Sequence, residues 1–106
     1  QRVATWLDAR GAFVAALASC HMLWFLSIAA TRGFVVDGYA DDATGTMARV
    51  AKGRLGITEV VLRPRVRFHG AAPDAATHEA MHHEAHDACF IANSVKSDVR
   101  VVPTLA

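Results

Sequence analysis

The first third of the chain carries a long run of apolar residues. Residues 12–31 read AFVAALASCHMLWFLSIAAT and contain no charged side chain. Twenty helical residues extend about 30 Å, which suits either a bilayer core or a helix buried inside a protein. Ser19, Cys20 and His21 lie at the centre of the run, where polar groups are costly in lipid. We therefore predict a helix from about Asp8 to Thr31 that is buried within the protein, with a membrane span as the less favoured interpretation.

Two stretches downstream have the character of strands. The residues from Phe34 to Val50 predict a strand that is bulged or bent at Gly38 and Gly45. A strict two-residue alternation then predicts a second strand, because every other residue of the stretch falls on one face, namely Val60, Leu62, Pro64, Val66 and Phe68. The proline cannot donate a ladder hydrogen bond, so we expect an edge position or a bulge there.

The last third of the chain predicts a helix and a short strand. Pro73 and Asp74 are favoured residues at the start of a helix, which we expect to continue to about Cys89. Residues 97–102 predict a final strand that ends at Pro103. The order helix, strand, strand, helix, strand predicts one α+β domain over residues 1–106, with the long helix packed on an antiparallel sheet.

The long apolar helix has too little cover in such a small domain. A helix that is apolar all round needs burial on every side, and three strands with one further helix do not supply it. We therefore expect the remaining cover to come from a second chain or from residues upstream of Gln1. The chain begins with Gln1 and not with Met, which also suggests a fragment or a processed form.

Composition and charge narrow the function classes. The chain is 53% apolar and 20% charged, which is typical of a globular protein and excludes a disordered one. Its formal net charge of +1 gives no overall field that would attract nucleic acid or an anionic membrane. Arg63, Arg65 and Arg67 alternate along the second strand without aromatic residues between them, which favours a solvated face. We expect no nucleic-acid or membrane partner.

Two cysteines, Cys20 and Cys89, are separated by 69 positions in the sequence. They are too few for a disulfide-stapled secreted scaffold. They remain open to four interpretations: a structural disulfide, part of a metal site, inert core thiols or a redox pair. A cysteine in an apolar helix is by default a small core residue. His21 is adjacent to Cys20 but points about 100° away around the helix, so it is a weak candidate for activating the thiol.

The second predicted helix is rich in histidine. His78, His82 and His86 are spaced four residues apart, and Cys89 follows three residues later. His82, His86 and Cys89 could together supply three zinc ligands. Residues 78–82 also spell H-E-x-x-H, although no later segment supplies the third ligand that a zinc protease needs. A solvated polar face is the other interpretation, and we favour it, so we assign no metal and no cofactor.

Two phrases around the cysteines resemble motifs of one known family. Residues 18–26, ASCHMLWFL, look like the central-helix cysteine motif of the OsmC/Ohr family of osmotically inducible and organic-hydroperoxide-resistance proteins. Residues 86–94, HDACFIANS, resemble that family's second cysteine motif, in which Asn and a small residue follow the cysteine. The resemblance covers about residues 12–103 and implies an OsmC-like α+β fold.

The resemblance implies an enzyme, a two-cysteine thiol peroxidase that reduces organic hydroperoxides in oxidative-stress defence. Cys20 would be the peroxidatic thiolate that becomes a sulfenic acid, and Cys89 would resolve it as a disulfide. A dithiol reductant would then restore both thiols. It also implies an intertwined homodimer that covers the long helix, and reversible thiol chemistry favours a cytoplasmic location.

The chain departs from the family pattern in two places. Family members activate the peroxidatic thiol with a Glu about ten residues before it and with an Arg from an N-terminal strand. Here Arg10 occupies the Glu position, and the N-terminal strands with their Arg have no identifiable counterpart. Two further hypotheses therefore stand beside the peroxidase: an OsmC-like binding or structural module without activity, and the zinc site of His82, His86 and Cys89.

Overall fold

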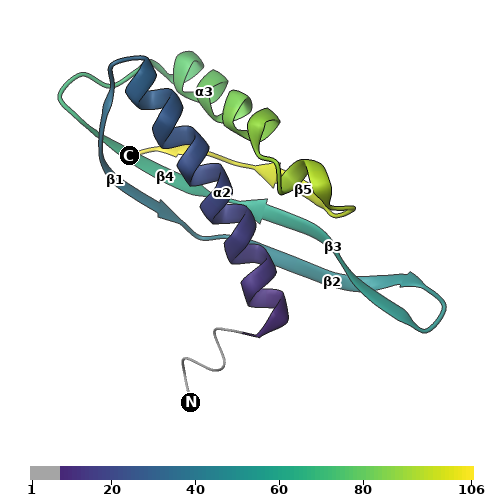
Figure 1. The fold of residues 1–106 in the computed structure, drawn as a ribbon. Coiled ribbons are helices and arrows are strands. Elements are labelled where there is room, and N and C mark those ends of the chain that lie inside the picture. Colours follow the sequence, from purple (N-terminus) through teal and green to yellow (C-terminus); the bar gives the residue numbers. More distant parts are fainter. Residues whose placement is uncertain (1–7) are drawn as a thin grey trace.

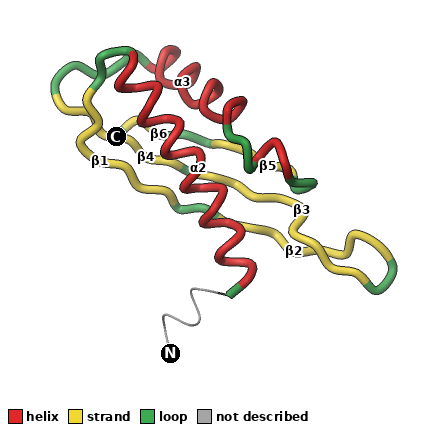
Figure 2. The backbone as a smooth tube through the Cα atoms, viewed as in Figure 1, coloured by secondary structure: helices red, strands yellow, loops and turns green. Residues whose placement is uncertain are grey.

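The structure is a computed structural model that describes residues 8–106. Its two main helices lie on the same side of the strands, as Figures 1 and 2 show. The elements in chain order are α2 (Ala9–Thr31), β1 (Val35–Asp41), β2 (Thr44–Ala51), β3 (Arg54–Leu62), β4 (Pro64–His69), α3 (Ala75–Ala88), the short 3-10 helix η1 (Ala92–Ser94), β5 (Asp98–Val101) and β6 (Thr104–Leu105).

Both predicted helices are confirmed, and side-chain caps set where they begin. The Asp8 carboxylate accepts a hydrogen bond of 2.7 Å from the Gly11 N–H at the start of α2. The Asp74 carboxylate does the same for Thr77 at the start of α3, also at 2.7 Å. Each cap satisfies one N–H that has no partner inside its helix. The left-handed backbone of Gly33, at φ 82°, follows the end of α2.

The α+β class is confirmed, but the predicted single sheet with three strands is wrong. The described strands form two mixed sheets in the orders β1-β4-β6 and β2-β3-β5. β1 pairs with β4 and β2 with β3 in antiparallel fashion, whereas β5 and β6 join β3 and β4 in parallel. Each long strand predicted from sequence therefore divides into two strands that belong to different sheets.

The two long predicted strands pair with each other in antiparallel fashion, and both are interrupted at the same place along that pairing. Asp41 pairs with Pro64 on one side of the break, and Thr44 pairs with Val61 on the other. Between them the Asp41 carboxylate accepts a hydrogen bond of 2.7 Å from the Arg63 N–H, and the Arg63 guanidinium donates to the Thr44 hydroxyl at 2.8 Å. Side chains thus replace the ladder where Pro64 has no N–H to give. The bulge predicted near Gly38 is also present.

α2 crosses both sheets and supplies the core of each. Its C-terminal half packs with β4 and α3 in a cluster of Phe25, Ile28, Ala29, Val66, Met81 and Ala85. Its N-terminal half packs on β3 through Leu17, Val60 and Leu62. The predicted inward face of the alternating stretch is confirmed, because Val60, Leu62, Pro64 and Val66 are all buried.

The opposite face of α2 is left uncovered by its own chain. Among the described residues, α2 is the one helix long and apolar enough to cross a membrane, and 33% of its most apolar window is buried. Leu23 is 61% exposed and Trp24 is 36% exposed. The helix therefore packs as a core helix on one side and presents apolar surface on the other, as the sequence led us to expect.

Candidate active site

The two cysteines, 69 positions apart in sequence, meet between α2 and α3. Cys20 lies in the middle of α2, and Cys89 caps the C-terminal end of α3. Both are free thiols and both are buried, with 5% and 1% of their surface exposed. The Cys20 side chain lies close enough to Cys89 to raise the pKa of its thiol. The fold thus brings together the two residues that the sequence singled out for redox chemistry.

The backbone after α3 shapes the surroundings of Cys89. Burial raises the pKa of the Cys89 thiol, and the neighbouring Cys20 side chain raises it further. The N–H groups of Ala92 and Ile91 act on this pKa in the opposite direction but are outweighed. The raised pKa favours the neutral thiol form of Cys89 beside Cys20.

The residues that follow Cys89 in the second cysteine motif hold this turn in place. The Asn93 N–H donates to the Cys89 carbonyl at 3.1 Å, and the Asn93 amide side chain donates to the Asp87 carbonyl at 2.9 Å. The Ser94 hydroxyl donates to the Phe90 carbonyl at 2.6 Å. These bonds close the end of α3 and begin η1, so Asn93 and Ser94 hold the backbone on both sides of Cys89.

Next to the cysteine pair lies a chain of three buried imidazoles. His21 Nε2 is 3.0 Å from His82 Nδ1, and His82 Nε2 is 3.1 Å from His78 Nε2. The three rings are 1%, 2% and 4% exposed for His21, His82 and His78. Phe25 stacks on the His82 ring with centroids 4.0 Å apart. A neutral imidazole can donate at one nitrogen and accept at the other, so the middle ring satisfies both of its nitrogens.

Burial keeps these rings uncharged. Loss of solvation lowers the pKa of His21 to about 4, and the nearby His86 adds to the effect. Loss of solvation also lowers the pKa of His82 to about 3, with further contributions from His21 and His78. The pKa of His78 is lowered for the same first reason. All three side chains are therefore neutral hydrogen-bonding groups at physiological pH.

This arrangement overturns both metal interpretations of the histidine-rich helix. His82, His86 and Cys89 do not form a zinc site, because both ring nitrogens of His82 are already bonded to other imidazoles. In residues 8–106 no group of three His, Cys, Asp or Glu side chains could hold a metal ion. The predicted solvated face is also wrong for His78 and His82, since both are buried against Phe25.

Arg10, which stands at the family's Glu position, lies away from the cysteines. It is exposed in the first turn of α2, about 15 Å along the helix from Cys20 at the usual rise per residue. With Asp8 and Asp41 it lines a cavity of about 640 Å³, whose other walls come from small apolar residues of α2 and β2. No counterpart of the family's N-terminal Arg is identified, and residues 1–7, which precede the helix, lie outside the described part of the chain.

Sequence reasoning missed the importance of His21. It was judged only as a possible activator of Cys20, and its turn away from that residue counted against it. The same turn places His21 on the buried stripe of α2, one helical turn from Leu17 and from Phe25. Its four-residue spacing from these apolar neighbours was the available signal that the imidazole faces the protein interior.

A family model and the solved structures with a similar fold both point to OsmC-like proteins. A family model described as OsmC-like protein matches residues 9–103. The chain is 50% identical to an OsmC-like protein of unknown function from Vibrio cholerae, with a TM-score of 0.86, over 90% of this chain and 62% of that one. The chain thus spans less than two thirds of the Vibrio protein. No curated protein matches it.

Two organic hydroperoxide resistance proteins share the fold at low identity. That of Bacillus subtilis has a TM-score of 0.71 at 17% identity, over 93% of this chain and 70% of that one. That of Elizabethkingia anophelis, with thiocyanate bound, has a TM-score of 0.73 at 16% identity, over 93% and 67%. At such identity the likeness establishes the shared fold and leaves the chemistry to be argued from the residues.

Proposed function

Because the chain belongs to the OsmC-like protein family, we propose that it is a thiol peroxidase that reduces organic hydroperoxides. The observation that carries the proposal is the contact between the free, buried thiols of Cys20 and Cys89. Two thiols held together without a bond are the reduced form that a two-cysteine cycle requires. The names of the two resistance proteins with the same fold agree with this function.

The proposed cycle uses each cysteine for a different step. The sulfur of Cys20 attacks the hydroperoxide, so that its S–O bond forms, the O–O bond breaks, and the thiol proton leaves with the alcohol product. Cys89 then attacks the Cys20 sulfenic acid, which forms the disulfide and releases water. An external dithiol reduces the disulfide and is itself oxidised. Cys20 lies beside the exposed surface of Leu23 and Trp24, whereas Cys89 is 1% exposed, and this supports the division of roles.

The surroundings of Cys20 support an organic rather than a small polar peroxide. The exposed surface of α2 just beyond Cys20 is formed by Leu23 and Trp24, which with Ser27 line a shallow cavity of about 230 Å³. An alkyl or lipid tail can bury apolar area there, at about 25 cal/mol for each Å² removed from water. A hydrogen peroxide molecule would gain nothing from this surface.

We also propose that the working form is a cytoplasmic homodimer. The uncovered apolar side of α2 is the surface that a second copy would cover, and Cys20 lies beside it. A dithiol reductant is available in the cytoplasm, which fits a cycle that must return to two thiols. The cytoplasmic location rests on the peroxidase proposal. The homodimer rests also on the resemblance to the OsmC/Ohr family, which implies dimers whose long helices are covered by both subunits.

The test is a thiol count by intact mass before and after one equivalent of cumene hydroperoxide. The expected result is the loss of two hydrogen atoms, with both thiols blocked to alkylation. Cys20→Ser is expected to abolish turnover, whereas Cys89→Ser is expected to form one sulfenic acid, trapped by dimedone, and then stop. If Cys20→Ser, Cys89→Ser and the parent protein all reduced cumene hydroperoxide equally fast, the proposal would be wrong.

One observation favours a second function, an OsmC-like binding or structural module without turnover. Arg10 replaces the activating Glu and lies in the first turn of α2, well away from the cysteines. The same mass experiment separates the two functions. If both thiols stay free and alkylatable in excess peroxide while the protein remains folded, the module is the better description.

A further inference from the structure

The buried histidines and the two cysteines join the same pair of helices. His21 follows Cys20 directly on α2, while His82 and Cys89 both belong to the α3 segment. We propose that His21 and His82 are positioning residues that hold α2 against α3, so that Cys20 and Cys89 stay within reach of one another for disulfide formation. The proposal deepens the peroxidase function and takes its reaction from it.

The His82 ring is held on its edges and on one face. Its two nitrogens bond to His21 at 3.0 Å and to His78 at 3.1 Å, and Phe25 of α2 stacks on its face with planes 17° apart. The rings of His21 and His82 are themselves nearly parallel, with an interplanar angle of 6°. A ring constrained in this way fixes both the separation of the helices and their relative height.

A polar link at this depth is costly wherever a partner is missing, and His21 Nδ1 is buried without a hydrogen-bond partner among the described residues. Burying an imidazole without partners loses its hydrogen bonds to water, which costs roughly 1–3 kcal/mol per group. An apolar side chain of similar shape would fill the same space without that risk. A hydrogen-bonded ring also fixes the relative position of the helices. A shift of about one ångström would break the 3.0 Å bond between His21 and His82, whereas apolar contacts could re-form after the same shift.

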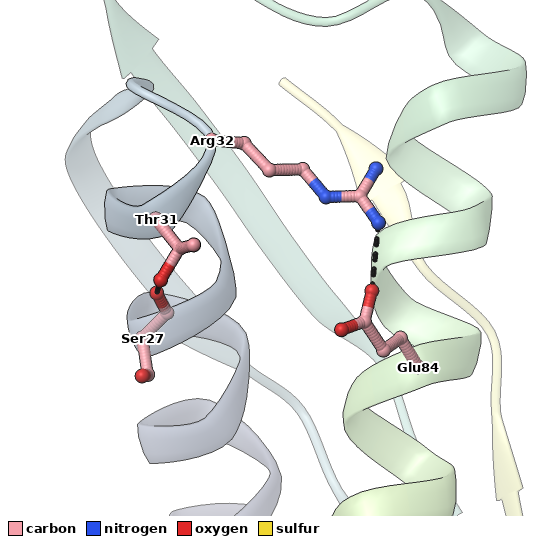
Figure 3. A network of polar contacts seen from close by, with 4 residues as sticks. All are labelled: Ser27, Thr31, Arg32 and Glu84. Carbon is pink, nitrogen blue, oxygen red and sulfur yellow. Dashed lines mark hydrogen bonds and ion pairs between the residues drawn. The ribbon is translucent and has the colours of Figure 1, made fainter.

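The other polar link between the two helices is too weak, and too far from Cys20, to hold the two cysteines within reach of one another. In residues 8–106 the other side-chain hydrogen bond or ion pair between these helices joins Glu84 of α3 to Arg32, which caps α2, at 2.7 Å (Figure 3). Its side chains are 41% and 53% exposed, and exposed pairs contribute little. It also lies at the far end of α2, about 18 Å of helix from Cys20. The histidine link is one residue away.

Disulfide formation is sensitive to this kind of placement. The Cα atoms of a disulfide lie about 4.4–6.8 Å apart, and wider separations need backbone movement. A displacement of about 1 Å in a reacting pair can cost on the order of a hundredfold in rate. Loosening the helices near His21 is therefore expected to weaken ring closure between Cys20 and Cys89 more than it weakens the first attack on peroxide, which needs only Cys20.

The test compares His82→Phe with the matched control His83→Phe. His83 is its neighbour on α3, and its side chain is 76% exposed, so the same substitution there leaves the helix contact intact. The equilibrium constant for the Cys20–Cys89 disulfide is measured against glutathione at pH 7.5. We expect a fall of at least about tenfold in His82→Phe and a change of less than about twofold in the control.

Trapping of the Cys20 sulfenic acid and two milder substitutions, His82→Gln and His21→Gln, test the same positioning role. With one equivalent of cumene hydroperoxide, His82→Phe is expected to accumulate the dimedone-trappable Cys20 sulfenic acid, formed at the parent's rate but closed more slowly. His82→Gln and His21→Gln retain a donor and an acceptor, and should fall between parent and Phe variant. Equal disulfide constants in the parent, His82→Phe and both Gln proteins would overturn the positioning role.

The two proposals can fail separately. A parent protein that forms the disulfide with glutathione but ignores cumene hydroperoxide refutes the peroxidase and still allows the positioning role to be measured. A parent that reduces peroxide, with an unchanged disulfide constant in a folded His82→Phe, refutes the positioning role alone. If His82→Phe does not fold by circular dichroism, the two Gln variants decide the question.

Discussion

Acidification should unfold this protein earlier than its size suggests, because His21 and His82 cannot take up protons in the folded state. Both rings are buried, and the pKa values of about 4 and about 3 lie well below the ordinary value of about 6.5 that they regain on unfolding. Above pH 7 both states hold the rings neutral, so stability is at its full value. As the pH falls below about 6.5, these two imidazoles bind protons in the unfolded chain but stay neutral in the folded protein. The free energy of unfolding therefore decreases.

The size of the effect follows from the same values. At pH 5 the unfolded state gains about 2 kcal/mol from each ring, or about 4 kcal/mol from His21 and His82 together. The lowered pKa of His78 adds to the loss in the same direction. Since a small domain is stable by about 5–15 kcal/mol in total, such a loss brings the protein close to unfolding.

The assay is urea denaturation of the reduced protein between pH 7.5 and pH 5, followed by circular dichroism. The free energy of unfolding is expected to fall by about 4 kcal/mol over this interval. His82→Gln cannot titrate and should lose about half of that dependence, whereas His83→Gln, altered at an exposed neighbour, should keep all of it. A stability that changes by less than about 1 kcal/mol between these pH values would refute the reasoning.

Three further predictions follow from packing, metal content and assembly. Gly45→Val should destabilise the protein by about 1–3 kcal/mol in urea denaturation, because a Cβ there would lie 2.7 Å from Val14 Cγ2; adding Val14→Ala should restore part of the loss. Protein purified without chelator should contain well under one equivalent of zinc by elemental analysis, and EDTA should leave its melting temperature unchanged, because His82 has no free ring nitrogen. Sedimentation should show a dimer that Leu23→Glu converts to monomer, since a charge would enter the uncovered face of α2; a monomeric parent would contradict this.

The parts of the fold that could be predicted from sequence are those decided by neighbours along the chain. The caps Asp8 and Asp74 mark the starts of both helices, and the alternation from Val60 to Phe68 identifies the buried face. The break between β3 and β4 escaped prediction because the alternation runs straight across it. Leu62 and Pro64 are both buried, so the pattern gives no sign that the strand changes partner at Arg63.

The candidate site divides in the same way. The contact between Cys20 and Cys89 was expected only through the family resemblance, since no spacing rule links residues 69 positions apart. Spacing within α3 placed His78 and His82 on one helix face, but it favoured a solvated face there, with a zinc site of His82, His86 and Cys89 as the alternative. The third member of the chain, His21, comes from another helix, and a pattern read along one helix cannot reveal it.

The position of Cys20 around α2 explains how a buried sulfur could meet both of its proposed partners. Successive residues turn by about 100°, so Cys20 falls between the buried stripe of Leu17, His21 and Phe25 and the exposed side that includes Leu23. On the buried side it meets Cys89, which caps the end of α3. On the other side its neighbours are apolar and exposed, so a peroxide with an organic tail can approach there. A second copy packed on that side would enclose the approach, and turnover should then depend on assembly. On dilution of the parent protein, the fraction of dimer and the rate of peroxide reduction are expected to fall together, and Leu23→Glu is expected to lose both.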